Sequence, residues 1–510
     1  MPSRRAEAAG NGGTDAACAA CYQHTAHHGA IRQKRGRLQC SIGAGLHGRA
    51  RLAKAGFVKE SCTIAQQRLS IQDKVNLWQP FKGRRRGGTC RMIRIATAVS
   101  ALALAFGACQ TLAQDAPTAA SKPTPAPAPF MGTALGEGPW DMSSAEGPIH
   151  VEVLTRGLVN PWGMAFLPDG SMLVTERPGR LRIVAGDGTL DPEPIKGLPE
   201  IYALGIAGLN DVVLDPQFET NHRIYLAYSK PNPSGADEQA LAVARAVWDG
   251  GHELHDVEDI FLAAPWYGAQ TQPERCCGQG PAFGSFGGRL LFDGEGHLFV
   301  TSGDRNYGEM VAGQDNHFGK ILRLNADGSV PADNPWVGRD GARPEVWSTG
   351  HRNPLGLTIN PFTGDLWDTE FGPRGGDEMN RIMRGGDYGW MSVTQGFHYN
   401  GEPTEAVSKV PGKIDPVLAW GPPSLNPGNI AFYKGEAFPG WQGDLLLATF
   451  TEGLLRYDTD AQGMPLNQPE TLLKDLGQRW RDVRVGPDGA LYLLTDMADG
   501  AIIKVTPAEG

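Results

Sequence analysis

Charged residues are scarce in this 510-residue sequence, and positive charge is scarcer than negative charge. Asp, Glu, Lys and Arg make up 20% of the chain, with 47 Lys and Arg against 56 Asp and Glu, for a net charge of −9. General nucleic-acid binding needs a basic surface, so this balance argues against it. Hydrophobic residues make up 41% of the chain, which excludes a wholly disordered protein.

Cysteine is rare, with eight residues, and five of them lie in the first 91 positions. Cys18 and Cys21 have the spacing of a metal-binding pair, but a zinc module needs a second pair, and Cys40 and Cys62 stand alone. A zinc module is therefore not expected. For the adjacent pair Cys276–Cys277, free thiols, a bridge to another chain and a strained vicinal disulfide all stay open.

Long hydrophobic runs are absent apart from one near the N-terminus. Residues 1–91 carry a net charge of +13 without regular periodicity, and we expect a disordered basic leader or sequence upstream of a misplaced start. Met92 opens a short basic segment, which is followed by the apolar run 95–108 and a small-residue cleavage site. This pattern predicts a secretory signal peptide over 92–113, because the run is too short to span a membrane. We expect a periplasmic or secreted protein, and Cys109 leaves a lipid anchor open.

Glycine and proline, in contrast, are abundant, with 68 and 38 residues. Both break helices and favour turns, so the composition argues against a helical bundle and for a turn-rich, all-β protein. Segment 114–130 is a Pro/Ala-rich linker that cannot bury apolar surface. The folded domain is expected over 131–510.

A repeated pattern dominates that domain. A glycine-containing turn precedes a hydrophobic strand that ends in Thr or Ser, and a second alternating strand follows. The pattern occurs five times, ending at Thr175, Thr301, Thr369, Thr449 and Thr495, and a sixth, looser copy ends at Ser229. The units are too long and irregular for a β-helix, and helical intervals of the βαβ type are missing. Six four-stranded units predict a six-bladed β-propeller, with function on the loops at one end.

Those loops contain strings that resemble the soluble aldose sugar dehydrogenases, often described as glucose/sorbosone dehydrogenases. The strings include NPWGMAFLPDG, GGRLLFDGEGHLFVTSGDR, GHRNPLGL, EFGPRGGDEMNRI, GGDYGW and RDVRVGPDGALYLLTD. The resemblance extends in order over 150–507. It implies a secreted, six-bladed quinoprotein that uses pyrroloquinoline quinone (PQQ) and Ca²⁺.

The resemblance also implies binding residues. Those implied for PQQ are Arg352, Asn353, Tyr399, Arg479 and Arg481. An arginine offers a planar, always-charged fork to a carboxylate, and the i, i+2 spacing of Arg479 and Arg481 places both on one face of a strand. Those implied for Ca²⁺ are Gly372 and Pro373, through their carbonyls, and Glu378 and Tyr388 at a second site.

Three polar positions of the family are changed in this sequence. The family's catalytic histidine, which removes the sugar hydroxyl proton, is replaced by Ser285, whereas the carboxylate that orients it is kept as Asp304. A cofactor-contacting glutamine is replaced by Ile206 and a lysine by Thr451. A serine hydroxyl is a poor base near neutral pH. Asp304 is the first replacement candidate, and His351 and His317 are weaker ones.

The favoured function is therefore PQQ- and calcium-dependent oxidation of an aldose at C1 to its lactone. Its partners would be a sugar and a soluble electron acceptor, and the protein would be a monomer or homodimer. Two alternatives stay open. One is a weakened or inactive propeller that binds sugar or cofactor, and the other is a calcium-dependent lactonase.

Overall fold

The computed structural model describes residues 131–268, 284–404, 406–407 and 409–508. The predicted leader, signal peptide and linker lie outside these residues, as does the Cys276–Cys277 pair. Where the structure is described, no helix is both long and apolar enough to cross a membrane.

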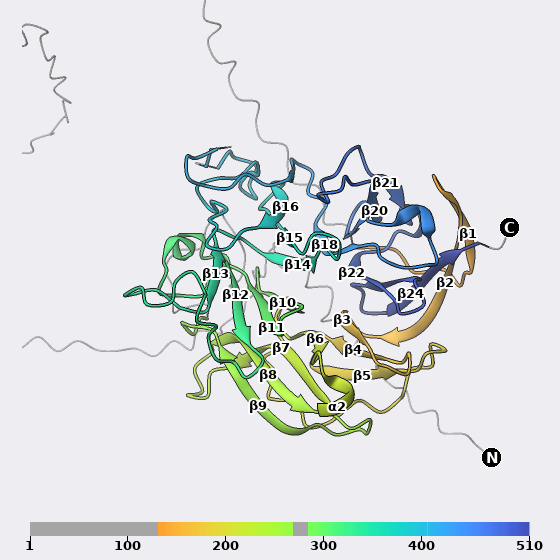
Figure 1. Ribbon diagram of the computed structural model, residues 1–510, viewed down its shortest axis with the longest axis horizontal. Coiled ribbons are helices and arrows are strands. Elements are labelled where there is room, and N and C mark those ends of the chain that lie inside the picture. The colour runs from red at the N-terminus through yellow and green to blue at the C-terminus, as the bar shows by residue number, and fades with distance from the viewer. Residues whose placement is uncertain (1–130, 269–283, 405, 408, 509–510) are drawn as a thin grey trace, which may run out of the picture. The chain divides into compact units, whose positions relative to one another are not determined.

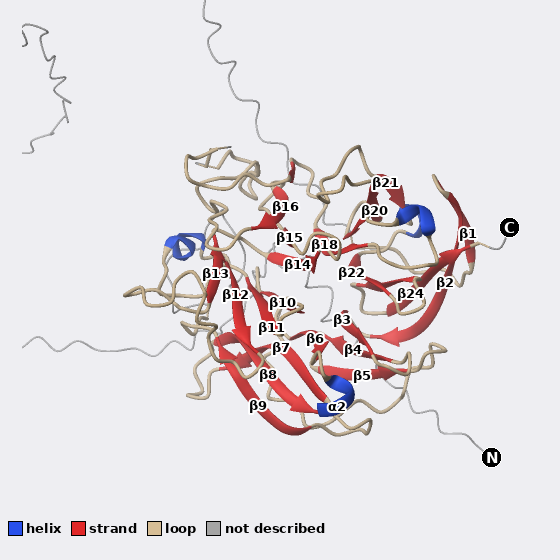
Figure 2. Ribbon diagram, viewed as in Figure 1, coloured by secondary structure: helices blue, strands red, loops and turns tan. Residues whose placement is uncertain are grey.

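The described residues form six antiparallel sheets arranged in a ring, joined by loops with only short helical turns (Figures 1 and 2). The first two sheets consist of β3 (Pro161–Phe166), β4 (Met172–Glu176) and β5 (Arg180–Val184), and of β6 (Leu209–Leu214), β7 (Arg223–Pro231), β8 (Gln239–Val247) and β9 (His255–Leu262). The next two consist of β10 (Gly287–Phe292), β11 (His297–Ser302), β12 (Lys320–Asn325) and β13 (Val346–Thr349), and of β14 (Pro354–Ile359), β15 (Leu366–Glu370), β16 (Asp377–Ile382) and β17 (Leu418–Trp420). The last two consist of β18 (Pro427–Phe432), β19 (Leu445–Thr449), β20 (Leu454–Tyr457) and β21 (Glu470–Leu472), and of β22 (Trp480–Val485), β23 (Leu491–Thr495) and β24 (Gly500–Pro507) with β1 (Trp140–Ser144) and β2 (Gly147–Leu158). The helical turns are α2 (Phe218–Asn221), η2 (Gly308–Ala312), η3 (Pro439–Trp441) and η4 (Lys474–Leu476).

The first strand of each sheet lies innermost. In chain order these are β3, β6, β10, β14, β18 and β22, and each contacts the next, with β22 returning to β3. The ring is closed by β2, which pairs with the last strand β24, so that Val151 lies opposite Val505. The prediction of an all-β, six-bladed propeller is therefore confirmed.

The six sequence repeats coincide with the second strands of the sheets, β4, β7, β11, β15, β19 and β23. In three of the six repeats, the hydroxyl at the end bonds to an inner strand. Thr175 Oγ1 accepts from the Gly163 amide at 3.0 Å, Thr301 Oγ1 accepts from the Arg289 amide at 2.9 Å, and Thr369 Oγ1 donates to Gly428 O at 2.8 Å. These buried bonds explain why the repeat ends in a hydroxyl residue.

The prediction of four strands in every sheet is wrong for two of them. The sheet β3–β4–β5 has three strands, because the chain after β5 carries Pro192 and Pro194, which cannot donate to a ladder, and only isolated bridges form there. The last sheet has five strands, because β1 pairs with the outer edge of β2. Between sheets, apolar side chains such as Tyr225, Val243 and Leu298 form the buried core.

Candidate functional site

All six inner strands shift register against their second strands within the first few residues. Such a bulge redirects side chains, and here it gathers polar side chains at the centre of the ring. Arg289 on β10 lies 3.3 Å from Asp211 on β6 and 3.3 Å from Asp482 on β22, and its guanidinium lies 4.2 Å from the ring centroid of Trp162. Arg484 bonds Asp482 at 3.1 Å, so two arginines and two carboxylates neutralise one another at the centre.

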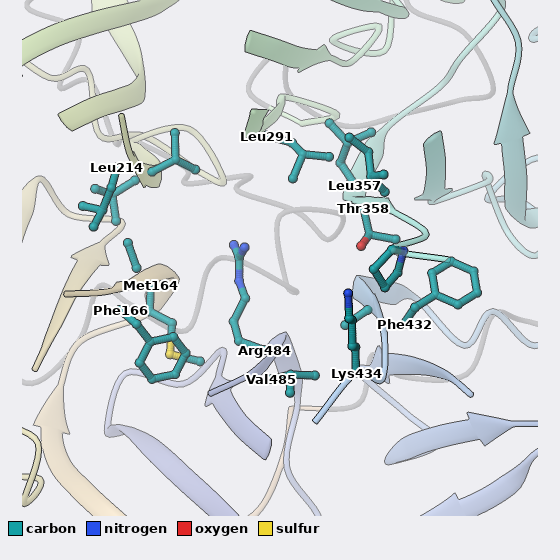
Figure 3. A pocket seen from close by; sticks show the side chains of 16 residues that line it. Met164, Phe166, Leu214, Leu291, Leu357, Thr358, Phe432, Lys434, Arg484 and Val485 are labelled. Atoms are coloured by element: carbon teal, nitrogen blue, oxygen red, sulfur yellow. The ribbon is translucent and has the colours of Figure 1, made fainter. Parts of the chain in front are cut away.

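A cavity of about 510 Å³ lies at the end of the ring where the inner strands terminate (Figure 3). Apolar side chains such as Leu291, Leu357 and Phe432 line it, with Arg484 near its middle. None of the predicted site residues lines this cavity. Ser285, Arg352 and Arg479 lie at the opposite end instead, just before the inner strands β10, β14 and β22. Asp304 and Gly372 lie at that end too, just after the second strands β11 and β15.

A group of arginines lies at that opposite end, around one carboxylate. Arg479 and Arg481 donate to Asp496 Oδ2 at 3.1 and 2.9 Å, and Arg177 reaches Asp496 Oδ1 at 3.5 Å. Their side chains are 5 to 15% exposed. Burial alone would raise the pKa of Asp496, but the three arginines hold it below its ordinary value. Among the described residues, three arginines therefore gather around this one carboxylate as an arginine cluster.

An aromatic pair connects the arginine cluster with Arg352. The guanidinium groups of Arg479 and Arg481 lie 4.1 and 4.6 Å from the ring centroid of Phe450, and this ring contacts Phe371 edge-on at 5.5 Å. Arg352 Nη1 donates to Phe371 O at 3.0 Å and to Gly372 O at 2.5 Å. The site therefore has cations on both sides of an aromatic centre.

The other two residues implied for PQQ lie beside Arg352. The hydroxyl of Tyr399, which is half-buried, accepts from Arg352 Nη2 at 3.4 Å. Asn353 Oδ1 accepts from the Gly287 amide at 3.1 Å and so ties the Arg352 loop to the start of β10. Asn353 thus holds two loops together through a hydrogen bond that its motif did not indicate.

Ser285 lies just before β10, in left-handed backbone with φ of 50°. Its hydroxyl donates to Asn306 Oδ1 at 3.1 Å and also lowers the pKa of Asp304. Its carbonyl, with those of Phe286 and Gly303, accepts from the guanidinium of Arg305 at 2.5 to 3.0 Å. Arg305 therefore fixes the backbone that presents Ser285.

Asp304, the first candidate for a replacement base, does not face an open pocket. Its side chain is fully buried, because Trp390 Nε1 donates to Oδ2 at 2.7 Å and the Asn306 amide donates to Oδ1 at 2.8 Å. Burial raises the pKa of Asp304, against the opposing effects of Arg352 and these hydrogen bonds. Trp390 fills the position in front of the carboxylate.

Two of the four residues implied for Ca²⁺ line a small cavity of about 10 Å³, close to the space that one water or ion needs. Gly372, Glu378, Glu370 and Arg352 line it. Pro373 O lies next to this group and accepts from the Ser424 hydroxyl at 3.3 Å. Tyr388 does not line the cavity, since its hydroxyl donates to Arg381 O at 2.6 Å and its ring stacks on His351.

The weaker base candidates have internal partners. His317 Nε2 lies 2.6 Å from Glu345 Oε1, and its Nδ1 accepts from the Ala264 amide. His351 is fully buried and contacts Ser348 and Glu370. Ile206 packs on the hydrophobic core, and Thr451 bonds the carbonyls of Ser424 and Leu425, so neither change supplies a new charge.

The sequence predictions missed Arg177, Asp496, Phe450 and Trp390. Three of these follow a repeat directly, because Arg177 comes two residues after Thr175, Phe450 follows Thr449 and Asp496 follows Thr495. All repeat strands end at the same side of a propeller. Reading the one or two residues after each repeat would therefore have found these three, whereas Trp390 carries no such signal.

The fold and the site together define a six-bladed β-propeller with a group of buried arginines at one end of its ring. Residues 158–504 match the glucose/sorbosone dehydrogenase family, and the chain belongs to this family. It is 39% identical to aldose sugar dehydrogenase YliI of Escherichia coli over 374 residues, covering 71% of this chain and 94% of that one. A crystal structure of a glucose dehydrogenase is 41% identical with a TM-score of 0.64, covering 70% and 99% of the two chains. The PQQ-bound aldose sugar dehydrogenase of Streptomyces coelicolor is 25% identical with a TM-score of 0.56, covering 70% and 98%.

Proposed function

We propose that the protein is a PQQ- and calcium-dependent dehydrogenase that oxidises an aldose at C1 to its lactone and passes the electrons to a soluble acceptor. The arginine cluster carries this proposal. Arg177, Arg479 and Arg481 gather around the carboxylate of Asp496, so three guanidinium groups converge at one nearly buried place. PQQ is a planar quinone with three carboxylates, and guanidinium groups are well suited to bind such a ligand. The residues present therefore fit the cofactor.

The arginine cluster would hold PQQ on one side and Arg352 and Tyr399 on the other, with Phe450 and Phe371 between them. PQQ, when bound, supplies the oxidant for the sugar. The carbonyls of Gly372 and Pro373 are hard oxygen ligands suited to the cofactor's calcium ion. Glu378, which lines a small cavity together with Gly372, would supply a carboxylate to a second calcium site. Tyr388 would contribute to this second calcium site through its backbone carbonyl.

The proton of the sugar hydroxyl needs an acceptor in this chain. Ser285 Oγ contacts both Asn306 and Asp304, so its hydroxyl can take that proton while passing its own to the Asp304 carboxylate. A carboxylate of raised pKa is a stronger base than an ordinary one. Because this route has two transfers and Asp304 is buried beneath Trp390, turnover is expected to be slower than with a histidine at this position.

The alternative of binding without turnover is supported by the same serine, since the arginines are kept while the base is lost. The test is to add PQQ and Ca²⁺ to the purified protein and follow both PQQ binding and dye reduction with a panel of aldoses. Dye reduction by an aldose supports the dehydrogenase. Tight PQQ binding without dye reduction supports the alternative, and lactone hydrolysis without PQQ would favour a calcium-dependent lactonase.

Export is part of the proposal. The segment 92–113 has the order of charges, apolar residues and small residues of a signal peptide, and PQQ-dependent oxidation with an external acceptor fits a periplasmic or secreted enzyme. Fractionation of cells that express the chain tests this, because a cytoplasmic, unprocessed product contradicts it. Mass analysis of the exported chain distinguishes cleavage near Ala113 from lipidation at Cys109.

A further inference from the structure

The cavity of about 510 Å³ is walled by the ends of the inner strands (Figure 3). Five of these strands, β3, β6, β10, β14 and β22, are buried over their first four residues and only partly buried over their last two. These partly buried ends place apolar side chains on the wall of the cavity, namely Phe166, Leu214, Leu291, Ile359 and Val485. A continuous apolar surface that keeps contact with solvent is typical of a site for a ligand or a partner.

Two cations interrupt this apolar wall. Figure 3 shows the side chains of Arg484, from β22, and of Lys434, which follows β18, pointing into the cavity. Lys434 is exposed, and its Nζ lies 5.8 Å from the ring centroid of Phe362. Among the described residues, no side chain or carbonyl forms a hydrogen bond or an ion pair with the Lys434 ammonium.

The charges around the cavity favour one negative charge inside it. No residue that lines the cavity in the described structure is acidic. Arg484 is already paired with Asp482 at 3.1 Å and with Asp211 at 3.5 Å, and neither carboxylate lines the cavity. Lys434 is therefore the cation that a ligand would neutralise. Thr358 adds a hydroxyl to the same wall, which can donate to an anion.

We propose that this cavity binds a straight-chain aliphatic carboxylate, such as a medium-chain fatty acid. Its carboxylate would bind at Lys434, and its chain would lie along the apolar strand ends. The volume of the cavity falls within the range of small-molecule sites, about 300–1,000 Å³. A neutral amphiphile would leave Lys434 unpaired, and a sugar would bring hydroxyl groups that the apolar wall cannot satisfy.

This site is independent of the proposed oxidation. Ser285, Arg352 and the arginine cluster lie at the other end of the ring. Between the two ends lies the buried network of Arg289, Asp211 and Asp482, in the middle of their strands. A ligand in the cavity would therefore touch neither PQQ nor the sugar.

The test titrates the purified full-length chain, without PQQ, with straight-chain carboxylates below the concentrations at which they form micelles. The heat of binding is measured by calorimetry. We expect about one equivalent of decanoate to bind, and each methylene removed between decanoate and hexanoate should weaken binding about fourfold. Decanol, which keeps the chain but lacks the charge, should bind about tenfold more weakly than decanoate. Saturating PQQ should leave the affinity for decanoate unchanged.

Lys434→Met tests the position of the carboxylate. Methionine keeps an apolar chain without the charge, so decanoate should bind about tenfold more weakly while decanol binds as before. Because Lys434 is exposed, this variant should fold as the wild-type chain does. Lys196→Met is the matched control, since it removes the same charge from an exposed lysine that does not line the cavity.

Equal affinities of Lys434→Met and Lys196→Met for decanoate would overturn the inference, as would equal affinities of the wild-type chain for decanol and decanoate. An affinity that does not depend on chain length would mean adsorption of the carboxylate at the surface and would refute the cavity site. Competition between PQQ and decanoate would place the carboxylate in the arginine cluster and would refute it as well.

Discussion

Replacing Ser285 by histidine tests whether a missing base limits turnover. The backbone there has φ of 50°, a region in which histidine and asparagine are among the better-tolerated side chains. The serine hydroxyl already lies 3.1 Å from Asn306 Oδ1 and contacts Asp304. An imidazole at this position would find an acceptor for one ring nitrogen and could direct the other toward the sugar.

The expected gain follows from what a positioned base contributes. General bases typically supply about 10² to 10⁴ in rate, which corresponds to about 3 to 5 kcal/mol of transition-state stabilisation. Ser285 is only 5% exposed, so the larger imidazole must displace neighbours, and Trp390 already occupies one oxygen of Asp304. We therefore expect Ser285→His to raise kcat about a hundredfold, at the low end of this range.

The assay is dye reduction with PQQ, Ca²⁺ and the best aldose, at saturating cofactor. Ser285→Asn is the matched control, because asparagine also tolerates the left-handed backbone but cannot act as a base. The activity of Ser285→His should fall below about pH 6.5 as the imidazole is protonated. If Ser285→His binds PQQ as the wild-type chain does and is no faster than Ser285→Asn, the missing base is not the limiting defect.

Three further outcomes follow from buried charges. Asp496→Asn leaves three arginines without their carboxylate, so the free energy of unfolding should fall by about 3–5 kcal/mol in urea titrations, and an unchanged value would contradict the charge balance. Burial lowers the pKa of Lys320 from 10.5 to about 7, so between these values the unfolded chain binds more protons and stability rises with pH. Urea titrations at pH 7 and about pH 9.5 should show this rise in the free energy of unfolding for the wild-type chain but not for Lys320→Met. The same pH dependence of stability in both proteins would refute the pKa shift. In Arg305→Lys, the lysine cannot make the three hydrogen bonds that Arg305 donates to carbonyls. This variant should therefore lose about 1–3 kcal/mol of unfolding free energy and should also reduce the dye more slowly. If stability and rate are both unchanged, other contacts fix Ser285.

The propeller could be predicted from the sequence because each blade repeats a local signal. The alternation of apolar residues and the glycine turns depend only on neighbours along the chain, and so they identify β4, β11 or β23 without tertiary information. The number of strands per sheet depends on pairing at the outer edges. That is why the three-stranded first sheet and the added strand β1 were missed.

The site could be predicted only in part, and the missing part is long-range. The resemblance indicated Arg479 and Arg481 by their motif. It did not indicate Arg177, which joins the cluster through Asp496, a residue 319 positions further along the chain. The burial of Asp304 depends on Trp390, which is 86 positions away. No periodicity or local motif reports such contacts, because they arise when the ring closes.

The contacts of Ser285 are separate from those of the arginine cluster. The arginine cluster is anchored to β22 and β23, on blade edges that ring closure holds in place. Arg305 fixes the backbone at Ser285 through three hydrogen bonds to carbonyl oxygens, and the Ser285 side chain takes part in none of them. A change at Ser285 therefore alters proton transfer without disturbing the cations. Binding and turnover are separable in this fold, so PQQ affinity and dye reduction must be measured on the same variant before either is assigned to a residue.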